Sequence, residues 1–251
     1  MPLIEHLIEL RRRLLYSIIA LTIAFAGCYF VAEEIYNFLV RPLADLMAGQ
    51  EGRRLIYTGL HEAFFTYLKV AFFGAVCITF PIVAGQLWAF VAPGLYKNEK
   101  RAFLPFLFAT PVLFTLGAAL VYYLIFPLAW QFFLSFETTG GEGTLPIQLE
   151  AKVNEYLSLV MKLIIAFGLS FQLPVILMLM ARVGLVTSEG LARKRKYAIV
   201  ITFLVAAFLT PPDLISQVGL GLPILLLYEG SILAIKIVER RRRAREASAA
   251  D

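Results

Sequence analysis

Long apolar runs alternate with short polar bridges along the chain. Four of these runs can each supply the roughly 20 residues that a helix needs to cross a bilayer. They are Leu14–Val31, Phe64–Gly85, Phe103–Trp130 and Tyr156–Ala181. The pattern therefore predicts four transmembrane helices over these runs.

The last apolar region, Tyr197–Val238, is long enough for two segments but is interrupted by TPPD at residues 210–213. Paired prolines remove two backbone donors and block the continuation of a helix, so a hairpin is favoured over one long helix. At about 1.5 Å per residue, the first arm, Tyr197–Leu209, covers about 20 Å of a hydrocarbon core about 30 Å thick. The complete pattern predicts an all-α protein with six transmembrane helices, of which the last two are short.

Composition supports an integral membrane protein. Hydrophobic residues make up 60% of the chain, charged residues only 16%, and the mean hydropathy is +0.77. Ordinary soluble domains have about 25% charged residues, so a soluble protein is excluded. Cys28 and Cys77 fall at different depths of two antiparallel runs and are expected to be unpaired.

Basic residues indicate the orientation in the membrane. Most of the 23 Lys and Arg residues lie within the segments 11–13, 97–101, 182–196 and 236–245, which the six helices place on one side. Cytoplasmic loops carry an excess of Lys and Arg, so both termini are expected in the cytoplasm. This topology predicts a single transmembrane domain over residues 1–238 and a basic cytoplasmic tail over residues 239–251.

Four segments match one protein family, in the order in which that family has them. They are HLIELRRRL (His6–Leu14), QLWAFVAPGLYKNEKR (Gln86–Arg101), YLSLVMKLIIAFGLSFQLPV (Tyr156–Val175) and FLTPPDLISQ (Phe208–Gln217). With these segments spread over almost its whole length, the chain resembles the TatC component of the twin-arginine protein translocase.

The resemblance implies a fold, a function and a set of partners. The fold is a cupped arrangement of six helices in the bacterial cytoplasmic (inner) membrane. The function is that of a signal-peptide receptor and scaffold, which exports folded proteins with energy from the proton gradient. The partners are twin-arginine signal peptides, single-span TatA- and TatB-like subunits, further copies of the same chain and the lipid bilayer.

Two carboxylates are expected to bind the cargo's paired arginines. Glu9 lies in the N-terminal segment and Glu99 in the bridge after the second apolar run, so the predicted topology places both on the cytoplasmic side. A guanidinium group matches a carboxylate as a planar bidentate fork. By resemblance, Phe90 and Pro93 shape or line the same site.

Glu9 also has a purely local interpretation. Arg12 and Arg13 follow it at the three- and four-residue spacings at which helical side chains meet, so either can form a salt bridge with it. The two interpretations are compatible, since a cargo arginine could displace the local one.

Few polar or ionisable side chains lie inside the apolar runs. Gln172, where many members of the family have glutamate, is expected within the hydrocarbon core, facing the concave side and bound to protein, water or a partner helix. Glu229 is interpreted either as a structural hydrogen-bond anchor or as part of a polar cavity. Lys69 and Lys162 are expected to extend toward the outer interface.

The resemblance assigns architectural roles to Pro42, Pro211, Pro212, Asp213 and Gln217. The sequence contains no GxSxG, HExxH or CxxC motif, and its two histidines fall on opposite sides of the predicted membrane. No enzymatic activity, cofactor, metal or nucleic-acid partner is therefore expected. The alternative function considered is a small-solute secondary transporter, which the lack of inverted-repeat symmetry disfavours.

Overall fold

The structure is a computed structural model that describes residues 3–49, 53–95, 104–138, 140–141, 145–210 and 213–248. Its helices are α1 (Leu3–Phe30), α2 (Ala32–Met47), α3 (Glu62–Leu95), α4 (Leu104–Leu120), the π-helical turn η2 (Val121–Ile125), α5 (Phe126–Leu134), α6 (Val153–Ser170), α7 (Leu173–Arg182), α8 (Ser188–Arg193), α9 (Arg195–Leu209) and α10 (Leu214–Ser248). The described residues contain no strand, only two isolated bridges in loops. The predicted all-α class is confirmed.

Five helical segments within the described residues are long and apolar enough to cross a membrane. They are Ile4–Phe30, Glu62–Phe90, Pro105–Leu134, Val153–Arg182 and Leu214–Arg241. The helices predicted over the first four apolar runs are therefore present. Helix α9 has 15 residues and covers about 22 Å, so the sixth crossing stays a prediction.

The last helix differs from the expectation. The sequence predicts a short last helix, but α10 is continuous over 35 residues and contains Pro223. It also crosses the predicted boundary at residue 238 without a break, because the Arg, Glu and Ala residues that follow are strong helix formers. The apolar segment that can cross a membrane ends at Arg241, but the helix continues to Ser248.

Prolines interrupt two of the membrane segments. The segment expected over Tyr156–Ala181 is divided into α6 and α7, with Pro174 in the first turn of α7. In the preceding segment, the π-helical turn η2 ends where α5 begins, next to Pro127. A proline lacks a backbone N–H and crowds the preceding turn, which accounts for an irregularity next to each of these two prolines.

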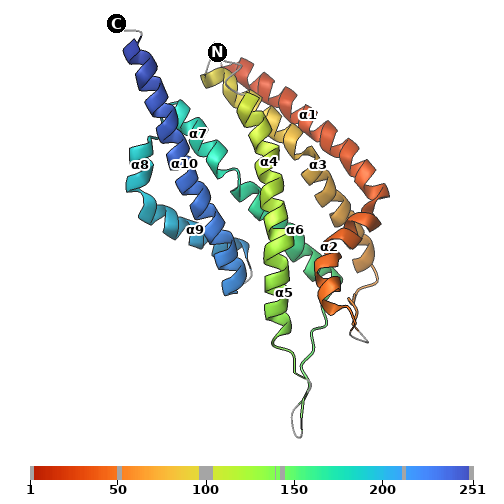
Figure 1. The fold of residues 1–251 in the computed structure, drawn as a ribbon. Helices are drawn as coiled ribbons and strands as arrows, with labels where there is room; N and C mark the ends of the chain where they lie inside the picture. The colour runs from red at the N-terminus through yellow and green to blue at the C-terminus, as the bar shows by residue number, and fades with distance from the viewer. Residues whose placement is uncertain are drawn as a thin grey trace.

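Figure 1 shows how the helices are arranged. Helices α1 and α3 form one flank, α9 and α10 the other, and α4 to α6 lie between them. Helix α1 begins and α10 ends at the same end of the molecule, and α2 lies at the opposite end.

Helix α2 covers one end of the central helices. Its backbone accepts hydrogen bonds from two buried tyrosines, from Tyr122 Oη to the Phe38 carbonyl at 2.6 Å and from Tyr156 Oη to the Leu39 carbonyl at 3.2 Å. Pro42 is buried within α2, and the architectural role that the resemblance assigns to it stays a prediction.

Two glycines allow α4 and α6 to approach closely. A Cβ added at Gly117 would lie 2.6 Å from the Phe167 carbonyl oxygen, and one at Gly168 would lie 2.5 Å from the Phe114 ring. Small residues at such crossings let transmembrane helices pack backbone to backbone. This close contact holds α4 against α6.

Candidate functional site

The N-terminal turns of α1 carry a charged cluster that faces α3. The Arg13 guanidinium donates to Glu9 Oε1 through Nε at 3.0 Å and through one terminal nitrogen at 2.6 Å. Its other terminal nitrogen donates to Gln86 Oε1 of α3 at 3.3 Å. The Arg13 and Glu9 side chains are only 19% and 15% exposed, whereas Arg11 and Arg12 are exposed. The cluster thus joins two helices near the end at which the chain begins.

An aromatic pair lies beside this cluster. The rings of His6 and Phe90 stack with their centroids 4.2 Å apart. His6 precedes Glu9 by about one helical turn and Phe90 follows Gln86 by about one turn, so the stacked pair continues the same α1–α3 contact. The site combines a carboxylate, an amide and an aromatic surface.

Of the four predicted signal-peptide-binding residues, the structure describes the side chains of Glu9 and Phe90. Glu9 forms the local salt bridge expected for it, with Arg13 rather than Arg12. Phe90 lies in the same contact, and Pro93 lies in the last turn of α3, where the backbone alone is described. Glu99 lies outside the described residues.

Gln86 was not singled out from the sequence, although it belongs to this site. The signal available was its spacing, since it lies four residues before Phe90 and therefore on the same face of a helix. Its half-buried side-chain oxygen accepts from the one Arg13 guanidinium nitrogen that does not donate to Glu9.

Gln172 lies at the break between α6 and α7 and is 6% exposed. Its Nε2 donates to the Thr110 carbonyl of α4 at 2.9 Å and to the Gly168 carbonyl at 3.5 Å. Its Oε1 has no partner among the described residues. Gln172 therefore acts as a buried hydrogen-bond donor that ties α7 to α4, so its expected partner is protein, and its orientation toward the concave side stays a prediction.

Glu229 pairs with a residue that the sequence did not indicate. Its two carboxylate oxygens accept from Arg195 Nε at 2.6 Å and from an Arg195 terminal nitrogen at 2.9 Å. The contact joins α10 to the first residue of α9, and both side chains are about half exposed. This geometry supports the interpretation of Glu229 as a structural anchor.

Two side chains, of Asp213 just before α10 and of Gln217 in its first turn, bond to backbone groups at the start of α10 and in α9. Asp213 Oδ1 accepts the Ser216 backbone N–H at 2.6 Å, and Gln217 Nε2 donates to the Phe203 carbonyl at 3.4 Å. The Asp213 contact caps the N-terminus of α10, since it satisfies an otherwise unpaired amide. Pro211 and Pro212 lie outside the described residues.

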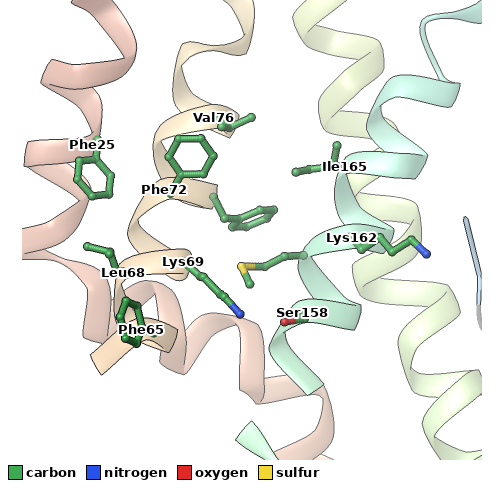
Figure 2. A pocket seen from close by; sticks show the side chains of 11 residues that line it. Phe25, Phe65, Leu68, Lys69, Phe72, Val76, Ser158, Lys162 and Ile165 are labelled. Carbon is green, nitrogen blue, oxygen red and sulfur yellow. The ribbon is translucent and has the colours of Figure 1, made fainter. Parts of the chain in front are cut away.

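An apolar groove of about 510 Å³ lies between α1, α3 and α6. Figure 2 shows Phe25, Phe65 and Phe72 on its α1 and α3 sides, with Lys69 and Lys162 at its edges. Further along α6, hollows of about 440 and 400 Å³ continue toward α9 and α10. Together they form an apolar surface along one side of α6.

Both lysines at this groove bind protein acceptors. Lys69 Nζ donates to Asn154 Oδ1 at 2.7 Å, and Lys162 Nζ donates to the Phe208 carbonyl at 3.2 Å. The second contact satisfies a carbonyl in the last turn of α9, where intrahelical donors are lacking. Figure 2 shows the Lys162 ammonium turned away from Lys69, so these cations act on separate contacts.

A charged contact joins the loops at the end opposite to the α1 N-terminus. The Arg53 guanidinium forms a two-pronged ion pair with the Glu137 carboxylate, which also accepts the Leu149 backbone N–H at 2.8 Å. The Arg53 hydrogen bonds lower the pKa of Glu137 to about 2, with a smaller contribution from the Leu149 amide. Glu137 therefore stays charged and holds the two loops together at physiological pH.

Metal-binding groups are absent from the described residues. These contain no group of three or more His, Cys, Asp or Glu side chains placed to hold a metal ion. Cys28 and Cys77 are free thiols, as expected from their positions in the sequence.

Comparison with known proteins gives one consistent family. Residues 5–223 match the family model described as Sec-independent protein translocase protein (TatC). The TatC protein of Magnetococcus marinus is 51% identical over 247 residues, which cover 98% of this chain and 88% of that protein. The TatC protein of Escherichia coli strain K12 is 38% identical over 245 residues, which cover 98% of this chain and 92% of that protein. A crystal structure of the twin-arginine translocase receptor TatC has a TM-score of 0.78 and 37% identity, covering 92% of this chain and 99% of that chain.

Proposed function

This chain belongs to the TatC family of Sec-independent protein translocases, and we propose that its cytoplasmic face binds the twin-arginine signal peptides of folded cargo. In this proposal, Glu9 and Glu99 contact the paired arginines, and Phe90 and Pro93 shape the site. The observation that carries the proposal is that Glu9 and Gln86 already hold a guanidinium group, that of Arg13.

The proposed orientation rests on charge and on the fold. Among the described residues, the basic segments 11–13 and 236–245 lie near the end of the molecule at which α1 begins and α10 ends (Figure 1). Because cytoplasmic loops are rich in Lys and Arg, this end faces the cytoplasm of a bacterial inner membrane. The protein then consists of one transmembrane domain over residues 1–238, and the helical segment beyond it extends into the cytoplasm.

The proposed partners are those that the family resemblance implies, and the apolar surface along α6 offers them a place to dock. We assign it to the lateral docking of single-span TatA- and TatB-like subunits, with further copies of this chain completing a receptor complex driven by the proton gradient. The groove is lined by phenylalanine and aliphatic side chains and has few polar atoms. Membrane helices associate mainly through van der Waals packing, which such a surface supports. Small-solute transport is not favoured, since the family is that of a protein translocase.

Peptide binding to the purified protein tests this function. We expect a labelled signal peptide with paired arginines to bind, and the same peptide with paired lysines to bind at least about tenfold more weakly, because lysine lacks the bidentate fork. Fluorescence anisotropy in nanodiscs gives both affinities. Equal affinity for the two peptides would contradict the proposal.

A further inference from the structure

Arg13 occupies a set of acceptors supplied by two helices. All three of its guanidinium nitrogens donate, two to Glu9 Oε1 of α1 and one to Gln86 Oε1 of α3. A lysine has a single nitrogen at the end of its chain and cannot reproduce this spread of donors. The acceptors therefore match the shape of a guanidinium and not just its positive charge.

Arg13 is also the arginine in its segment that is turned inward. Arg11 and Arg12 are exposed, whereas the Arg13 side chain is 19% exposed. An arginine that is partly open to water can leave its acceptors without crossing a packed core. A second guanidinium that arrived from the aqueous side would find the same acceptors.

We propose that Arg13 is an internal occupant of the site that the cargo arginine takes, and that Gln86 is a specificity-determining residue that favours arginine over lysine there. This inference rests on the proposed function, because it concerns the same site. When cargo binds, Arg13 moves into water and an arginine of the signal peptide donates to Glu9 and Gln86 in its place.

The exchange has two consequences for recognition. In the resting state, Arg13 keeps the Glu9 carboxylate paired beside apolar surface, where an unpaired charge is costly. During binding, the free energy of the Arg13 contacts is lost and must be offset by those of the cargo arginine. Arg13 therefore lowers the affinity of every peptide. The free energy of its lost contacts is offset best by another guanidinium, because only that group has the same donors.

Substitution of Arg13 tests the internal-occupant part of the proposal. We expect Arg13→Gln to bind the twin-arginine peptide about fivefold more tightly than the matched control Arg12→Gln, which removes the same charge from an exposed position. Arg13→Lys keeps the charge but loses the fork, and we expect it to bind more tightly than the wild type by a smaller factor. The readout is the dissociation constant of the labelled peptide, with thermal unfolding recorded for each variant.

Substitution of Gln86 tests the specificity part. We expect Gln86→Leu to lower the ratio of arginine-peptide to lysine-peptide affinity by about fivefold, mainly through the arginine peptide. Gln148→Leu, at an exposed position in the outer loop, is the control and should leave the ratio unchanged. A merely structural role for Gln86 would lower both affinities equally and would overturn this part.

The outcomes separate the inference from the function it rests on. Suppose that the wild type prefers the arginine peptide, but that Arg13→Gln binds it no more tightly than Arg12→Gln does and Arg13→Lys no more tightly than the wild type does. Arg13 is then not an internal occupant, and the proposed function still stands. If Arg13→Gln unfolds, Arg13→Lys decides. If the wild type binds both peptides equally, the proposed function itself is wrong.

Discussion

Replacing Glu9 or Glu99 with glutamine is expected to weaken binding of a twin-arginine peptide by about 1.5–3 kcal/mol, or about 10- to 150-fold. Each carboxylate is proposed to form a charge-assisted pair with a cargo guanidinium. Glutamine has nearly the same shape and keeps an acceptor oxygen, but it carries no charge. The expected loss is therefore that of the charge and not of the side chain's packing.

The fold should tolerate these two changes. Glu9 lies near the start of α1, and glutamine at this position can still accept from Arg13. The control is Glu5→Gln, which removes an exposed carboxylate from the same helix and should change affinity by less than about threefold. Full-strength binding by the Glu9→Gln, Glu99→Gln double variant would remove these residues from the site.

Gly117→Leu is expected to lower the stability of the protein strongly. A Cβ at this position would lie 2.6 Å from the Phe167 carbonyl oxygen, and a backbone atom cannot rotate away as the end of a side chain can. Overpacking of a core commonly costs about 1–3 kcal/mol and occasionally more, and a clash with backbone belongs at the upper end. Leucine otherwise favours a helix over glycine by about 0.8 kcal/mol, so any loss must come from the contact.

The matched control for this change is Gly27→Leu. A Cβ at Gly27 meets no atom within 4 Å, so leucine there can extend into lipid. Thermal unfolding in one detergent compares the two variants with the wild type. We expect a marked fall in melting temperature for Gly117→Leu alone, and equal melting temperatures would show that α4 and α6 do not pack as described.

The sequence predicts the membrane-spanning helices because the bilayer imposes a minimum length on apolar runs. It predicts the position of breaks less well, since Pro174 divides a span into α6 and α7, whereas Pro223 lies inside the continuous α10. The same ring is tolerated or not according to how neighbouring groups satisfy the freed carbonyl. The length of α10 also exceeds its apolar run, because hydropathy marks contact with lipid and not helix formation.

The candidate site could be predicted only in part, for a physical reason. The Glu9–Arg13 pair is local, and helical spacing alone indicates it. The contact of Arg13 with Gln86 joins residues 73 positions apart, and that of Glu229 with Arg195 joins residues 34 positions apart. Such partners depend on how helices pack, which a single sequence does not specify.

Site-specific photo-crosslinking tests the central claim most directly, because it reports the bound peptide, its position and the side of the membrane together. A photoreactive phenylalanine analogue at Phe90 keeps an aromatic ring beside His6, next to the proposed site. In inside-out membrane vesicles, whose cytoplasmic face is outward, we expect it to crosslink to a twin-arginine signal peptide and only weakly to the twin-lysine peptide. Crosslinking from right-side-out vesicles, or equal crosslinking to both peptides, would contradict the account.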